Sequence, residues 1–255
     1  MTALIAALVA GAVVGLALGG LGGGGSVLAV PALIYLLHFG PADATTAGLV
    51  IVTLTSVTAL SGHARDGNVA WRTGLLFAAA GVVPAMLAGT LADRVPATAL
   101  VVAFSVVAAL AAARMLRSPA TDGTGLPGRP SRPVRPAKAG AVGAGLGAVT
   151  GFLGVGGGFL AVPALVGVLG LAMRRAVGTS LLVITVNSLA ALGARAGTGM
   201  HLDWAVVGPF AAAAVLGAWD GRRLAGQVGG RTLQTLFAYV LLAVALFMLA
   251  DALVP

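Results

Sequence analysis

The chain has 255 residues, of which 59% are hydrophobic and only 9% are charged. A soluble domain carries roughly 25% charged residues, so this composition excludes an ordinary soluble domain and indicates an integral membrane protein embedded in the lipid bilayer. The formal net charge of +8 then indicates basic loops at the membrane surface and not nucleic-acid binding. The absence of Cys excludes disulfides and thiolate metal sites.

Ten apolar stretches follow one another along the chain, and one polar segment separates the first five from the second five. They are Leu4–Leu18, Val27–Phe39, Thr46–Leu60, Thr73–Leu91, Ala97–Leu116, Gly140–Leu153, Phe159–Leu171, Val177–Leu192, Trp204–Ala218 and Leu233–Leu253. The separating segment, Ser118–Lys138, is rich in Pro, Gly and Arg and has no apolar period. We expect it to be an exposed linker.

A glycine-rich motif interrupts the apolar stretches at the same place in both groups. Gly19–Leu33 reads GGLGGGGSVLAVPAL, and Gly151–Leu165 reads GFLGVGGGFLAVPAL, with eleven of fifteen positions identical. Glycine is costly inside a helix because it loses the most conformational entropy and exposes backbone. The doubled motif therefore predicts a deliberate break in two membrane helices, although close packing of helices through small residues is an alternative use of the same glycines.

The repeat continues beyond the glycines. Ala44–Leu60 lies on Ala176–Leu192 without a gap, and Trp71 lies on Trp204 after one inserted residue. The chain is thus predicted to be two copies of one unit, residues 1–117 and 139–255, joined by a cytoplasmic linker at 118–138. The expected fold class is an all-α polytopic membrane protein in which each unit holds a Gly-broken helix pair or hairpin followed by three transmembrane helices.

The charges predict that the second unit is inverted relative to the first. Val27–Phe39 is about 20 Å long as a helix, against a hydrocarbon core of about 30 Å, so it forms part of a broken helix or of a hairpin. Each unit then crosses the membrane an odd number of times. With inverted units, 13 of the 15 Lys and Arg residues fall on the cytoplasmic side with the linker, and only Arg94 and Arg195 fall outside. Parallel units would give a 9 to 6 split. Both termini are therefore expected outside.

Inverted repeats with broken helices are a recurring plan of secondary transporters, which hold substrate near the midplane. Helix N-termini present unpaired N–H groups and a partial positive charge, so they bind anions. We expect the two breaks to form an anion cradle from backbone groups of Gly23, Gly24, Gly25, Ser26, Gly156, Gly157 and Gly158.

Hydroxyl groups and one amide in the matching spans are further substrate-binding candidates, namely Thr55, Ser56, Thr179, Ser180, Asn187 and Ser188. Neutral donors suit an oxyanion that must be released again. The alternative is that Ser and Thr hydroxyls bond back to carbonyls of their own helix. Ionisable residues such as His63 and Arg195 fall at span ends, where we expect them at the interface.

The doubled break followed by VPAL, the GTSLL of Gly178–Leu182 and the GMHLDW of Gly199–Trp204 resemble the TauE/SafE family of sulfite exporters. The resemblance covers nearly the whole chain. It implies a plasma-membrane permease, in the inner membrane of a bacterium, for sulfur-containing oxyanions such as sulfite, thiosulfate or organosulfonates. A passive anion channel and a membrane scaffold subunit are the alternatives, and no enzyme activity, cofactor or metal is expected. The coupling ion, H⁺ or Na⁺, and a homodimer remain open.

Overall fold

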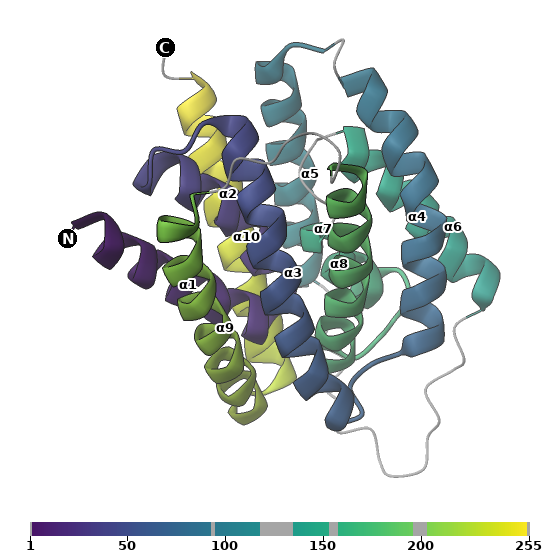
Figure 1. Cartoon of the computed structure of the whole chain (residues 1–255). Helices are drawn as coiled ribbons and strands as arrows, with labels where there is room; N and C mark the ends of the chain where they lie inside the picture. Colours follow the sequence, from purple (N-terminus) through teal and green to yellow (C-terminus); the bar gives the residue numbers. More distant parts are fainter. Residues whose placement is uncertain (1, 93–94, 118–134, 153–157, 196–202, 254–255) are drawn as a thin grey trace.

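The computed structural model describes residues 2–92, 95–117, 135–152, 158–195 and 203–253, and these parts of the chain are helical with short connections (Figure 1). In chain order the helices are α1 (Thr2–Leu21), α2 (Gly24–Pro31), the π-helix η1 (Ala32–Leu36), α3 (Pro41–Arg65), α4 (Trp71–Ala92), α5 (Ala97–Arg117), α6 (Pro136–Phe152), α7 (Gly158–Gly167), α8 (Met173–Arg195), α9 (Trp204–Gln227) and α10 (Gly230–Leu253). The predicted all-α class is confirmed, and α6 begins inside the segment predicted as linker.

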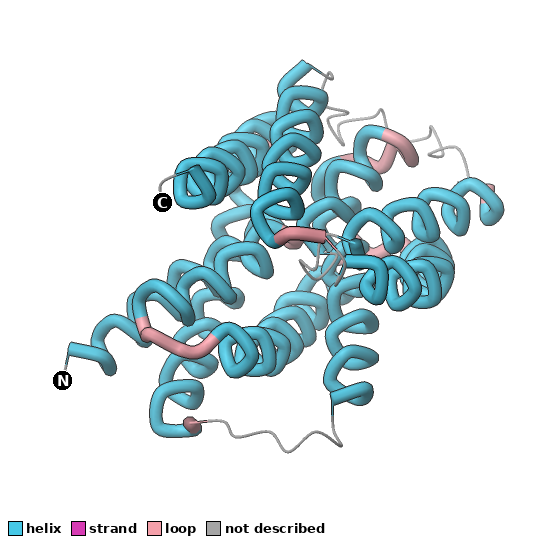
Figure 2. Tube along the Cα trace, turned by 90° about the horizontal axis from the view of Figure 1, so that it is seen from above, coloured by secondary structure: helices cyan, strands magenta, loops and turns pink. Residues whose placement is uncertain are grey.

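Seven of the described helices are long and apolar enough to cross a membrane: α1, α3, α4, α5, α8, α9 and α10. Large apolar side chains such as Met86, Leu110 and Leu216 are exposed on them, which is the pattern of a surface that faces lipid. The predicted multi-pass membrane protein is therefore confirmed. Figure 2 shows the same helices from above.

Two closely packed helix pairs each join one helix from the first half of the chain to one from the second. Along α1, Gly11, Gly15 and Gly19 face α9 at four-residue intervals, and a Cβ atom on Gly15 would overlap the carbonyl oxygen of Ala214. The equivalent contact in α4 and α6 places Gly147 against the carbonyl of Gly81. Small residues let these backbones approach closely, as the packing alternative predicted for glycines in the apolar stretches.

Contacts between named residues also give the helix directions. The glycines of α1 meet Phe210, Ala214 and Ala218 of α9 in ascending order, so these two helices are parallel. Across α3 and α8, Ser56 contacts Thr185 whereas His63 lies beside Gly178, so this pair is antiparallel. Gly74 near the start of α4 contacts Thr179 and Leu182 near the start of α8. Consequently α1, α3 and α9 run in one direction, and α4, α6 and α8 run in the other.

One end of the bundle collects the basic residues. The end of α3, the start of α4 and the start of α8 lie together there, and Gln234 at the start of α10 donates to the Met115 carbonyl near the end of α5. The helix ends that meet there carry Arg65, Arg72, Arg114, Arg117, Arg135, Lys138, Arg174, Arg175, Arg222, Arg223 and Arg231. Of the Lys and Arg residues in the described segments, Arg195 at the end of α8 is the one at the opposite end of the bundle.

Two local features set where the short helices begin and end. Gly22, with φ of +73°, ends α1, because this left-handed conformation strains any residue that has a side chain. Pro31 lacks an N–H group, and the turn after it widens into η1. Together α2 and η1 are 13 residues, or about 20 Å, long, and they return the chain from the end of α1 to the start of α3 at the opposite end.

Candidate functional site at the helix breaks

The two breaks meet inside the bundle. Gly23 immediately precedes α2, and a Cβ atom added to it would overlap the carbonyl oxygen of Gly158 and lie 2.8 Å from the Cα of Phe159. Gly158 is the first residue of α7. The starts of the two short helices therefore lie against each other, and they belong to opposite halves of the chain.

Helix α8 forms a wall beside this meeting point. A Cβ atom on Gly22 would lie 2.6 Å from Ser180 Oγ and 3.2 Å from the Val177 carbonyl oxygen. Ser180 is fully buried and is seven residues from the start of α8 at Met173, which places it about 10 Å along the helix axis from that end. The structure thus brings Gly23 and Gly158 of the predicted cradle together with Ser180, one of the predicted hydroxyl candidates.

The other predicted backbone groups divide into described and undescribed ones. Gly24, Gly25 and Ser26 form the first turn of α2, where N–H groups have no carbonyl partner within their own helix. Gly156 and Gly157 lie outside the described residues. The positive ends of the α2 and α7 dipoles, each equivalent to about half an elementary charge, meet at the break.

A second cluster of predicted residues lies where α3 crosses α8. Thr185 Oγ1 is 3.0 Å from Ser56 Oγ and donates to it, which links positions on the two repeat-related spans. Thr55 and Ser188 are buried in the same region of these helices. Thr185 and Ser188 are five and eight residues beyond Ser180 on α8, so this cluster is a separate one, roughly 8 to 12 Å further along the helix.

Most of the predicted hydroxyls bond back to their own helices. Thr55 donates to the Ile51 carbonyl at 2.7 Å, Ser56 to Thr53 at 3.1 Å, and Ser180 to Val177 at 2.8 Å. Ser188 contacts the Thr185 carbonyl at 3.3 Å in the same way. These hydroxyl hydrogens are directed at carbonyls, so each would have to rotate to donate to an anion.

Thr179 has a different set of contacts. Its hydroxyl donates to the Arg175 carbonyl at 2.6 Å and accepts from the Ala70 N–H at 3.0 Å. This second bond fastens the connection between α3 and α4 to the start of α8. The contacts account for Thr179 as a structural residue, and its role in binding substrate stays a prediction.

Asn187 Oδ1 and Ser105 Oγ are among the buried polar atoms that have no hydrogen-bond partner within the described part of the chain. An unpaired buried polar atom costs about 1–3 kcal/mol, so such an atom is worth retaining where it serves binding. Asn187 was predicted from the sequence as the amide within a span. Ser105 was missed, although it follows Phe104, whose ring packs 4.9 Å from that of Phe159 in α7. A hydroxyl in the middle of the apolar stretch of α5 was its only signal.

The bundle has seven membrane-length helices, and two short helices start against each other inside it. These features define a polytopic membrane protein with a buried backbone break. The model of the sulfite exporter TauE/SafE family matches residues 7–248. The chain therefore belongs to the sulfite exporter TauE/SafE family and is a membrane transporter.

Two curated relatives agree with this assignment. A "Probable membrane transporter protein" of Xylella fastidiosa (strain 9a5c) is 32% identical over 249 residues, which cover 96% of this chain and 95% of that protein. Its counterpart in Xylella fastidiosa (strain Temecula1 / ATCC 700964) is 31% identical over the same length, with the same coverage. No solved structure matches the chain significantly.

Proposed function

We propose that this protein is a secondary transporter that moves sulfur-containing oxyanions, such as sulfite, thiosulfate or organosulfonates, across the plasma membrane. The observation that carries the proposal is the contact between Gly23 and Gly158, where the starts of α2 and α7 meet inside the bundle. Two helix N-termini that lie against each other favour an anion, because their N–H groups and dipoles are both complementary to negative charge. Family membership favours an oxyanion of sulfur.

The donors at the site are neutral, and this suits a transporter. Ser180 lies at the break, and Asn187 supplies an amide whose oxygen is unpaired among the described residues. A fixed cation at the centre would hold the anion strongly and slow its release. Backbone N–H groups and neutral side chains can instead replace part of the water around the anion and release it on the other side.

The arrangement of the helices supports alternating access by inverted repeats. Helices at equivalent places in the two units run in opposite directions: α1 against α6, α3 against α8, and α4 against α9. The paired contacts α1–α9 and α4–α6 bind the two units together at two seams. A rocking movement of one unit against the other would expose the break to each side in turn.

The orientation in the plasma membrane follows from the basic end of the bundle. Loops rich in Lys and Arg stay on the cytoplasmic side. We therefore assign the end that carries Arg65, Arg174 and Arg222 to the cytoplasm, together with the linker. Both termini are then outside, because α1 begins and α10 ends at the opposite end of the bundle.

A thermal-shift screen on detergent-purified protein tests the substrate class. The panel holds sulfite, thiosulfate, sulfate, taurine, sulfoacetate and chloride at matched ionic strength. A ligand at about a hundred times its Kd stabilises the folded state by about 2.7 kcal/mol. We expect a rise in Tm with one or two sulfur oxyanions only, and loss of that rise in Asn187→Ala but not in the control Ser61→Ala, whose side chain is exposed. A flat response of folded protein to the whole panel would contradict the proposal.

A further inference from the structure

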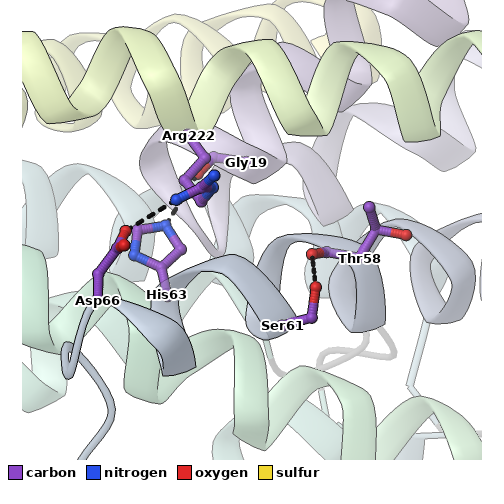
Figure 3. Close-up of polar contacts among 6 residues, drawn as sticks. All are labelled: Gly19, Thr58, Ser61, His63, Asp66 and Arg222. Carbon is purple, nitrogen blue, oxygen red and sulfur yellow. Dashed lines mark hydrogen bonds and ion pairs between the residues drawn. The ribbon is translucent and has the colours of Figure 1, made fainter.

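His63 is buried among four elements at the cytoplasmic end of the bundle. It lies near the end of α3, is only 5% exposed, and contacts α1 through the carbonyl oxygen of Gly19, which is 3.2 Å from Nε2 (Figure 3). Gly178 of α8 lies directly against its Cβ. The sequence predicted a histidine at the membrane interface, and the structure buries its side chain inside the protein. Its partner Gly19 lies three residues before Gly22, the turn that ends α1.

The hydrogen bond to Gly19 fixes which ring nitrogen carries the hydrogen. A carbonyl oxygen only accepts, so Nε2 must be the donor. In neutral imidazole the other nitrogen, Nδ1, is then a bare acceptor. Nδ1 is buried and has no hydrogen-bond partner among the described residues. The ring therefore holds an unused basic lone pair inside the protein.

Three charged groups lie near enough to this ring to act on it electrostatically, and they come from different elements. Asp66 follows α3, Arg222 comes from α9, and Arg174 comes from α8. The guanidinium of Arg222 lies across Gly62 and forms a 2.8 Å ion pair with Asp66 Oδ2 (Figure 3). Arg174 donates to the carbonyl oxygens of Gly226 and Val228 at the end of α9, at 2.9 and 3.0 Å. α1 contributes only the backbone of Gly19.

A proton on Nδ1 would change this balance. The imidazolium would face two guanidinium groups, and the carboxylate of Asp66 is already paired with one of them. The present arrangement therefore suits the neutral ring, and a different placement of Arg222 and Asp66 suits the charged one. Because Arg222 belongs to α9, which packs along α1, that displacement acts on the helix that ends at the first break.

We propose that His63 is the proton-binding site of this transporter, and that its protonation shifts the bundle to a second conformation by displacing Arg222. The step is simple in its chemistry: the Nδ1 lone pair accepts H⁺ from hydronium in cytoplasmic water. The N–H bond forms as an O–H bond of hydronium breaks, a neutral water is released, and the ring gains one positive charge. The inference rests on the proposed function and names its coupling ion. If the proton and the anion each bind more tightly to one of the two conformations, then binding of either ligand changes the affinity for the other.

The test uses Trp219 as a reporter, because the guanidinium carbons of Arg222 and Arg223 lie 5.4 and 5.6 Å from its ring centroid. In a Trp71→Phe, Trp204→Phe background, Trp219 is the one remaining tryptophan. We expect its fluorescence, measured without substrate, to change in a single step as the pH is lowered, because histidine is the side chain that gains a proton most readily near neutral pH. The step should vanish in His63→Gln, whose amide retains an N–H donor for Gly19, and persist in the exposed control His38→Gln.

Two further variants keep His63 and decide the matter if His63→Gln does not fold. Asp66→Asn removes the negative charge that favours the imidazolium, so the midpoint should move to lower pH. Arg174→Gln removes a positive charge, so the midpoint should move to higher pH. A step that survives in His63→Gln, midpoints that do not move in these directions, or no step in folded protein would each overturn the proposal.

The fluorescence titration does not depend on transport, so the proton site and the proposed function can fail separately. Anion transport without the fluorescence step would overturn the proton site and leave the proposed function standing. A step without any anion transport would support protonation of His63 and overturn the proposed function.

Discussion

Replacing Gly23 with alanine is expected to lower the initial rate of sulfur-oxyanion transport by more than tenfold, while the protein remains inserted in the membrane. The new Cβ would overlap the carbonyl oxygen of Gly158, which is backbone and cannot move aside as a flexible side chain can. The starts of α2 and α7 would therefore separate, and the N–H groups at the break would no longer face one point. The measurement is uptake into proteoliposomes by purified variant and wild-type protein at equal density.

Gly145→Ala is the matched control, because Gly145 is also a helical glycine but has open space where its Cβ would be. Alanine should be tolerated there and even stabilise α6 slightly, by up to about 1 kcal/mol. Normal transport by Gly23→Ala would show that the meeting of the two breaks is not the substrate site.

Gly15→Val is expected to separate α1 from α9 and to cause the largest loss of stability of any single substitution considered. Its Cβ would overlap the backbone carbonyl of Ala214, and the added methyl groups make the overlap worse. Overpacking of this kind costs on the order of 3 kcal/mol. For a protein of this size the corresponding drop in Tm is roughly 6–12 °C, measured by thermal unfolding of detergent-purified protein.

The pseudo-symmetry of the contacts provides a second test of the same packing. Gly147→Val in α6 should cause a drop of similar size, since Gly147 meets the carbonyl of Gly81 as Gly15 meets that of Ala214. Gly208→Val, on α9 but with open space around it, should leave Tm within a degree or two. Equal Tm values for Gly15→Val and Gly208→Val would contradict the close contact between α1 and α9.

The helices themselves were largely predictable from the sequence. Each of the ten apolar stretches coincides with a helix, with α2 and η1 together filling the second, because membrane burial requires long runs of apolar residues. Many ends were predicted too short, whereas the stretches Val27–Phe39 and Phe159–Leu171 run past the ends of η1 and α7. α3 extends from Thr46 back to Pro41 and from Leu60 on to Arg65, because a helix continues into the polar interface after its apolar residues stop. Pro41 begins it, and Gly67, with φ of +70°, follows its end.

The partners of each helix were not predictable from one sequence. Local hydropathy identifies a lipid-compatible segment but does not specify which other segment it packs against. The glycine motif illustrates this limit. Gly19 packs on Ala218 of α9, whereas Gly22 and Gly23 form the break. Helix packing and helix breaking, the two alternatives for the motif, therefore each apply to different glycines. The burial of His63 was not predictable for the same reason, since it comes from α1, α8 and α9 and not from its own span.

The most direct test of the central claim is solute counterflow in proteoliposomes, with labelled thiosulfate outside and unlabelled sulfite, thiosulfate or chloride inside. A transporter that binds a sulfur oxyanion where the two breaks meet should give saturable uptake that is accelerated by internal sulfur oxyanions, not by chloride, and is lost in Gly23→Ala. Uptake that does not saturate and is equal for chloride would indicate a channel. No uptake by folded, inserted protein would contradict the transport of sulfur oxyanions altogether.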